Sequence, residues 1–196
     1  MASLTLVTPP DVDVEPITLD EAKSHCRVDI DRDDALLTGL IVAAREQFEL
    51  LTGRQVFTAV WALKLDGWPC WIDVPKAPLL SSPAVAITYL DTAGTTQTLA
   101  TTQYRVDAPV GPTAARGIIE PAYGVTWPSL YLVSNNVTVT FSAGYGATRD
   151  AVPAMAKQAM LLWLLPEYQR RTMTDDERRA FRARIAMFST WARQRQ

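Results

Sequence analysis

Residues 16–53 constrain the fold most, because they predict two helices joined by a short acidic turn. In the second helix, apolar side chains recur at helical spacing on one face, while charged and amide side chains occupy the other. Gly53 follows as a helix stop. The first helix opens with Thr18 and Glu21, a capping box in which each side chain accepts from the other residue's backbone N–H. It spans only about two turns before Val28, so it must dock on its longer neighbour.

The acidic turn at residues 29–34 resembles the start of a calcium-binding loop. An EF-hand needs glycine at the sixth loop position and glutamate at the twelfth. Counted from Asp29, those positions hold Asp34 and Leu40. We therefore interpret the turn as N-capping of the second helix, with acidic side chains near the positive end of the helix dipole.

Between residues 54 and 149 the pattern changes to short β-branched and aromatic runs separated by Pro, Gly, Ser and Asn clusters. About six or seven strands at this spacing predict an antiparallel sandwich or barrel. The glycines of residues 141–146 predict a strand exit with unusual backbone angles, since the Lys-Ser/Thr of a phosphate loop is missing. The predicted strands are 56–65, 70–74, 84–90, 95–100, 104–107, 117–120 and 137–141.

Helical patterning returns at Asp150, which is the expected N-cap. Residues 154–165 are apolar on almost every face, which is typical of a core helix. Pro166 is expected to kink or end this helix. Thr174 and Glu177 repeat the capping-box signature and predict a final helix.

These patterns together predict the α+β class. A small helical bundle is expected from residues 16–53 and 150–196, with residues 54–149 inserted as an antiparallel β-sandwich or barrel-like domain. Residues 1–15 combine β-formers with prolines and acids, so we expect an extended N-terminal arm rather than a packed element.

Charge is distributed unevenly along the 196 residues. The formal net charge is −2, yet residues 167–196 hold eight arginines against four acidic residues, which makes the tail +4 and the remainder −6. The β region has few basic residues between its aromatics, which argues against a sheet that reads bases. Phe188 and Trp191 accompany the tail arginines, so the tail favours an acidic, partly apolar protein groove. A solvated helix face and a phosphate-binding helix remain open alternatives.

No catalytic or metal-binding constellation is visible in the sequence. His25, the one histidine, is adjacent to Cys26, and neighbouring helical residues point about 100° apart. HExxH and CxxC motifs are absent. We therefore expect no enzyme, no cofactor and no metal, and we expect Cys26 and Cys70 to be reduced, mostly buried thiols. No signal-peptide pattern or membrane-length apolar run is present, so synthesis in the cytoplasm without a membrane partner is expected.

The chain resembles the head-tail connector family, also called adaptor or head-completion proteins, of long-tailed phages and gene transfer agents. The resemblance is carried by PITLDEAKSHCRVDIDRDDALLTGLIVAAREQFELLTGRQV at 16–56, TVTFSAGYG at 138–146 and VPAMAKQAMLLWLLPEYQRR at 152–171. It covers most of the chain and is weakest in the β insertion.

The resemblance implies a structural virion protein at the head-tail interface, made in the host cytoplasm. In this family a helical bundle, often with a β insertion, assembles into a ring, commonly twelve-fold, beneath the portal. The ring extends the DNA channel without sequence-specific binding and receives the next neck or tail-completion protein. The family's C-terminal segment docks onto the portal protein. By position rather than by motif, the portal-binding residues implied here are Arg178, Arg179, Arg182, Arg184, Phe188, Trp191, Arg193 and Arg195.

A function from another class remains as the alternative. A nucleic-acid-binding accessory protein would use the Arg-rich C-terminal helix to contact phosphates, and its binding would be sensitive to salt.

Overall fold

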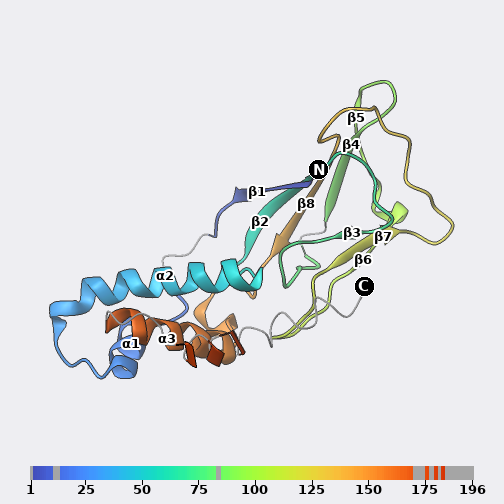
Figure 1. Ribbon diagram of the computed structural model, residues 1–196. Helices are drawn as coiled ribbons and strands as arrows, with labels where there is room; N and C mark the ends of the chain where they lie inside the picture. The colour runs from blue at the N-terminus through green and yellow to red at the C-terminus, as the bar shows by residue number, and fades with distance from the viewer. Residues whose placement is uncertain are drawn as a thin grey trace.

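The computed structural model describes residues 2–10, 14–82, 85–169, 175–176, 179–180 and 182–183. Three helices gather at one end of the molecule and the strands at the other (Figure 1). The predicted α+β class is confirmed. In chain order the elements are β1 (Ala2–Thr8), α1 (Leu19–Cys26), the 3-10 turn η1 (Asp31–Asp33), α2 (Asp34–Thr52), β2 (Ala59–Leu65), β3 (Ile72–Asp73), β4 (Ala86–Leu90), β5 (Thr96–Thr98), η2 (Thr101–Gln103), β6 (Tyr104–Asp107), β7 (Ile118–Pro121), β8 (Val137–Ala143), η3 (Arg149–Ala151) and α3 (Ala154–Tyr168).

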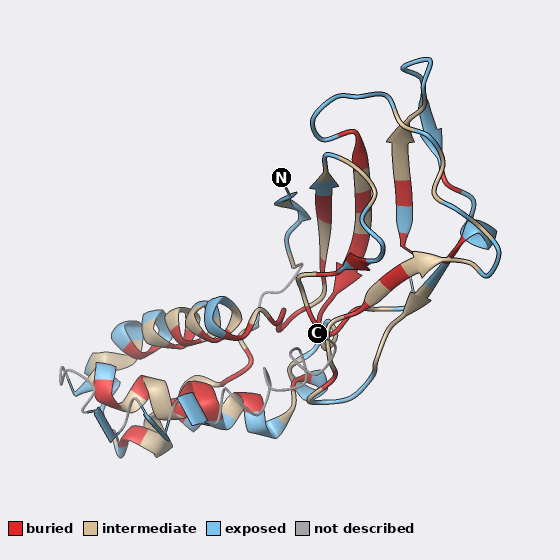
Figure 2. Cartoon of the chain, turned by 45° about the vertical axis from the view of Figure 1, so that its right-hand side comes forward, coloured by how far each residue is buried: buried red, intermediate tan, exposed pale blue. Residues whose placement is uncertain are grey.

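The strands form two antiparallel sheets. One has the order β1-β2-β8-β4-β5 and the other the order β3-β7-β6. Both contribute to one hydrophobic core, in which Ile87 and Val139 of the larger sheet and Ile119 of the smaller one are fully buried. Along β4, β7 and β8 the remaining positions are mostly of intermediate burial, whereas β1 and β5 are largely exposed (Figure 2).

A second core holds the helices together. The helices α1, α2 and α3 contact one another, and Leu37, Phe48, Ala156 and Met160 are among the residues that they bury. Val56 and Phe57 are also fully buried in this core, although the sequence predicted them at the start of a strand. Strand β2 therefore begins only at Ala59, and before it Phe57 forms an isolated bridge to Gly146.

The first two helices begin and end as expected. Glu21 N–H donates to Thr18 Oγ1 at 3.0 Å, and Thr18 N–H donates to a Glu21 carboxylate oxygen at 2.7 Å, so the predicted capping box is present. Gly53 ends α2 with φ +66°, a conformation that glycine adopts without steric cost.

The start of α3 corrects one prediction. Asp150 lies in the turn η3 and is not the N-cap, which is Pro153, so the helix begins at Ala154. Pro166 lies inside α3, which continues to Tyr168. Because Pro166 stands near the helix end, its missing N–H removes only one late hydrogen bond.

The acidic turn before α2 holds the helices together and does not cap α2 through a side chain. Asp33 occupies the N-cap position without a side-chain capping bond, and its carboxylate instead accepts from the Tyr168 hydroxyl at 2.7 Å. Lys23 Nζ lies 2.8 Å from Asp31 and 2.6 Å from Asp34. The turn therefore links α1, α2 and α3.

The first residues are paired, which corrects the expectation that they lie outside the packed elements. Residues 2–8 form β1, an edge strand of the larger sheet that runs antiparallel to β2. Leu4 packs partly against the β core. No helix in the described part of the chain is long and apolar enough to cross a membrane.

The strand exit after β8 depends on glycine, as predicted. Gly144 and Gly146 adopt φ +143° and +154°. A Cβ atom on Gly144 would lie 2.6 Å from the backbone N and Cα of Thr58. We expect Gly144→Ala to lower the free energy of unfolding by at least about 2 kcal/mol, because it adds backbone strain and a clash with backbone atoms.

Gly39→Ala is the matched control for this substitution. Gly39 is exposed within α2, and a Cβ atom added there would meet no neighbouring group within 4 Å. The control should raise the free energy of unfolding by about 0.5–1 kcal/mol, because alanine favours helix. Urea denaturation measures both variants, and equal effects would contradict the account of Gly144.

Candidate interaction surfaces and the polar junction

The one candidate nucleophile-base pair lacks the geometry of a catalytic site. His25 Nε2 is buried and makes no hydrogen bond within the described part of the chain. Burial raises the pKa of the neighbouring Cys26 thiol, which keeps it protonated near neutral pH. A Cys-His catalyst needs a lowered thiol pKa and a base that contacts it. Within the described residues, no group of three or more His, Cys, Asp or Glu side chains is placed to hold a metal ion.

The most unusual side chain of the molecule is Arg54, which follows the stop glycine of α2. It is only 1% exposed and is the largest fully buried side chain among the described residues. Its Nη1 donates to the Tyr145 hydroxyl at 2.9 Å and its Nη2 to the Ala114 carbonyl at 2.5 Å. Burial lowers the pKa of Arg54, although the contact with Tyr145 opposes this shift. A buried guanidinium stays protonated and must find acceptors.

Tyr145 extends this junction into the β half. Its hydroxyl donates to the Pro112 carbonyl at 2.8 Å, and its ring centroid lies 5.9 Å from the Arg54 guanidinium carbon. The backbone N–H of Gln55 donates to the Ala77 carbonyl at 2.9 Å. The end of α2, the loop around residues 108–116 and the exit of β8 are therefore joined through Arg54 and its neighbours.

A carboxylate network lies beside Arg54. Glu49 accepts from the Val56 backbone N–H and from Gln55 Nε2, each at 2.9 Å. Arg45 contacts Glu49 at 3.6 Å and donates to both carboxylate oxygens of Glu15, at 2.8 and 3.2 Å. Burial raises the pKa of Glu49, and the Val56 hydrogen bond and Arg45 oppose that rise.

The tryptophans of the β half anchor loops. Trp68 and Trp127 stack with ring centroids 4.6 Å apart, and Trp68 also contacts Tyr89 at 5.8 Å. Their indole N–H groups donate to the Pro128 and Pro69 carbonyls at 2.9 Å. The two side chains therefore hold the loop before β8 against the loop after β2.

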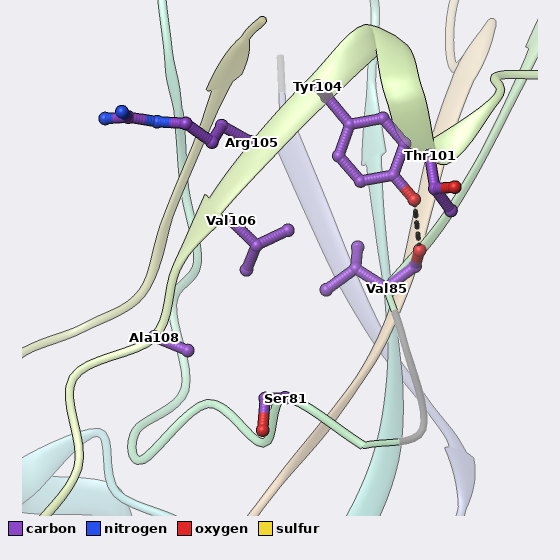
Figure 3. A pocket seen from close by; sticks show the side chains of 7 residues that line it. All are labelled: Ser81, Val85, Thr101, Tyr104, Arg105, Val106 and Ala108. Atoms are coloured by element: carbon purple, nitrogen blue, oxygen red, sulfur yellow. Dashed lines mark hydrogen bonds between the residues drawn. The ribbon is translucent and has the colours of Figure 1, made fainter.

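A pocket of about 270 Å³ opens beside β6 (Figure 3). The Tyr104 hydroxyl donates to the Val85 carbonyl across it and so links the two sheets. Besides Tyr104, Ser81 and Thr101 are the hydroxyl side chains of the lining, and no histidine or carboxylate lines the pocket with them as a base. The pocket thus lacks the partners that activate a hydroxyl nucleophile.

The portal-binding residues implied by the resemblance are only partly described. Arg179 and Arg182 are exposed at helical positions, and Arg179 Nη1 lies 3.6 Å from Asp176 with both side chains more than 80% exposed. The remaining predicted residues lie outside the described residues; they are Arg178, Arg184, Phe188, Trp191, Arg193 and Arg195.

Several exposed apolar side chains were not selected from the sequence. Leu132 is 98% exposed, Val110 is 89% exposed and Tyr123 is fully exposed, all on loops of the β half. Arg54 and Glu15 were also missed. A basic residue between a stop glycine and a strand was the one available signal for Arg54, and nothing local indicates that such a residue is buried.

Comparison with known proteins gives one family match. Residues 16–110 match the family described as phage gp6-like head-tail connector protein. These residues, just under half of the chain, are similar to that family, which confirms the resemblance inferred from the sequence. The matched family is one of head-tail connector proteins, which agrees with the expectation that the chain is not an enzyme. Comparison with curated proteins gives no match.

Solved structures match almost the whole chain. The neck of an empty GTA particle computed with C6 symmetry contains a chain with 24% identity and a TM-score of 0.70, covering 99% of this chain and 97% of that one. The neck of a native GTA particle computed with C12 symmetry contains a chain with 24% identity and a TM-score of 0.69, and the match covers 99% of this chain and 97% of that one. The virion of a native gene transfer agent particle contains a chain with 23% identity and a TM-score of 0.68, and the match covers 98% of this chain and 96% of that one. These likenesses show that the fold, including the β half, is shared.

The polar junction yields a stability prediction. We expect Tyr145→Phe to lower the free energy of unfolding by about 1–3 kcal/mol, because it removes an acceptor of a buried guanidinium and leaves the Pro112 carbonyl without its donor. Tyr123→Phe removes the same atom from a fully exposed side chain. That control should change stability by less than about 0.5 kcal/mol. Similar urea midpoints for the two variants would contradict a structural role of the Tyr145 hydroxyl.

Glu49 yields a pH prediction. The pKa of Glu49 is raised in the folded state, so the folded protein holds this proton more tightly than the unfolded chain does. The protein therefore loses stability as pH rises and Glu49 ionises. Glu49→Gln retains a carbonyl acceptor and removes the ionisation. We therefore expect the variant to gain stability relative to the natural chain as pH rises from about 4 to 7. Urea unfolding at several pH values measures the difference in stability between the two chains. A variant that loses stability relative to the natural chain as pH rises from about 4 to 7 would contradict the prediction.

Proposed function

We propose that this chain is a structural virion protein that forms a ring between the portal and the next neck or tail protein, and that the ring extends the channel through which DNA passes. The observation that carries the proposal is the family match over residues 16–110, because the family is described as head-tail connectors. The whole-chain likeness to neck proteins of GTA particles supports it. Those necks were computed with C6 and C12 symmetry, which is consistent with twelve copies around the axis.

The distribution of charge supports passage of DNA without tight binding. The chain apart from residues 167–196 has a net charge of −6. Affinity for DNA rises with each phosphate that lysine or arginine neutralises, so an acidic lining weakly retains DNA. The proposed ring therefore needs no base-reading surface.

The basic C-terminal segment is the proposed portal contact. The ion pair between Arg179 and Asp176 is long and exposed at both ends, and such pairs contribute little stability. Acidic groups of a partner can therefore replace Asp176 at little cost. Arg182 is exposed and adds a second positive charge at the described positions.

A co-assembly experiment tests the proposal. The full chain is mixed with the portal protein encoded in the same gene cluster, and native mass and negative-stain images report stacked rings. The test variant changes Arg178, Arg179 and Arg182 to Gln. The control changes Arg27, Arg32 and Arg105 to Gln, because these side chains are exposed and the net charge changes equally.

The proposal expects rings on the portal with the natural chain and the control, and at least about tenfold weaker association with the test variant. Absence of rings with the natural chain would overturn the connector function. Equal association of both variants would overturn the assignment of the arginines. Salt-sensitive DNA binding lost only in the test variant, without rings, would instead support the nucleic-acid-binding alternative.

A further inference from the structure

β1 is a strand that the rest of the fold does not need for its core. No residue of Ala2–Thr8 is buried, and Leu4 is the one member that packs even partly against the β core. Its extensive contact is with β2, against which it pairs from Ala2↔Leu65 to Thr8↔Val60 with an irregularity between Leu6 and Thr8. Removing β1 would therefore leave the buried core of both sheets in place.

The chain beyond β1 is anchored separately. Glu15 is held by Arg45 through two hydrogen bonds, and the Glu15 carbonyl accepts from Arg149 Nε at 2.9 Å. Ile17, two residues on, is 1% exposed in the helical core. The connection between strand and anchor is residues 9–15, which begin with Pro9 and Pro10. Strand β1 can therefore leave β2 while Glu15 and Ile17 keep their contacts.

The edge of β2 nevertheless requires a partner strand. Leu63 is 5% exposed and lies opposite Leu4 of β1, and Trp61 lies opposite Leu6. Without β1, a row of backbone N–H and C=O groups beside these apolar residues would be open to pairing with another chain. A strand with the sequence and register of β1 satisfies this edge.

Strand β1 also lacks the features that prevent pairing between chains. Residues 2–8, ASLTLVT, contain no charged residue and no proline, whereas natural edge strands are commonly protected by one or the other. Leu6 and Val7 are 42% and 54% exposed. Such an uncharged, half-apolar strand pairs equally well with β2 of its own chain and with β2 of a second copy.

We propose that β1 is exchanged in the assembled ring, so that β1 of each copy pairs with β2 of the next copy. This inference rests on the proposed ring. The exchange preserves every β1–β2 hydrogen bond and creates a head-to-tail link, which closes a ring when the rotation between copies allows it. A fully extended segment of the length of residues 9–15 spans at most about 24 Å. In the exchanged ring, β2 of the next copy must therefore lie within that distance of Glu15.

Disulfide trapping distinguishes exchange from pairing within one chain. Ser3 and Lys64 are register partners across β1 and β2, and both are exposed. Facing residues of antiparallel strands lie within the Cα separation that a disulfide spans. The test chain carries S3C and K64C with C70S, because Cys70 is exposed whereas Cys26 is buried. The control chain carries K64C and T138C, register partners across β2 and β8, also with C70S.

Rings are first assembled on the portal and verified by native mass, then oxidised and separated on a non-reducing denaturing gel. We expect the test chain to give a ladder of linked chains from rings, and linkage within single chains from free protein. The control should give linkage within single chains in both samples. Rings whose test chains are linked only internally, or not at all, would overturn the exchange and leave the connector function intact. Failure to form rings would overturn the proposed function, and the exchange with it.

Discussion

The structure depends on satisfying one buried positive charge. Arg54 stands where the helical and β halves meet, and its guanidinium is out of reach of water. A buried charge without acceptors is strongly destabilising, so the Tyr145 hydroxyl and the Ala114 carbonyl must stay within hydrogen-bond distance. The loop around residues 108–116 and the exit of β8 are therefore held to the end of α2.

Two hydrophobic cores are joined at this junction. Phe57 belongs to the helical core, although it lies only two residues before β2. The backbone of Thr58 approaches Gly144 so closely that no side chain fits between them. Glu49 connects the same region to Arg45 and, through Arg45, to Glu15. These contacts hold the loop around residues 108–116 and the exit of β8 at fixed positions relative to the end of α2.

Local features of this fold were predictable from the sequence. The Thr18–Glu21 capping box, the stop at Gly53 and the hairpin of β4 and β5 each depend on residues a few positions apart. The start of α3 was misplaced because Asp150 resembles an N-cap, and the competing turn η3 has no clear sequence signature. The pairing of β1 with β2 and of Tyr168 with Asp33 joins residues far apart in the chain, so neither has a local signal.

The interaction residues were less predictable than the fold. A charge pattern selected the arginines of the tail, yet a surface charge specifies neither its partner nor its geometry. Of those arginines, Arg179 and Arg182 are described and exposed. The assignment to connectors came from an extended pattern over residues 16–56, which the family match includes completely.

The position of the chain in an assembled particle tests the connector function most directly. A small folded tag can be inserted at residues 92–94, in the exposed turn between β4 and β5. Purified particles carrying the tagged chain are then imaged by electron cryo-microscopy. The connector function predicts tag density repeated around the axis at the junction of head and tail. Tag density on the capsid surface or tail tip, or complete loss of the chain from infectious or DNA-filled particles, would contradict it.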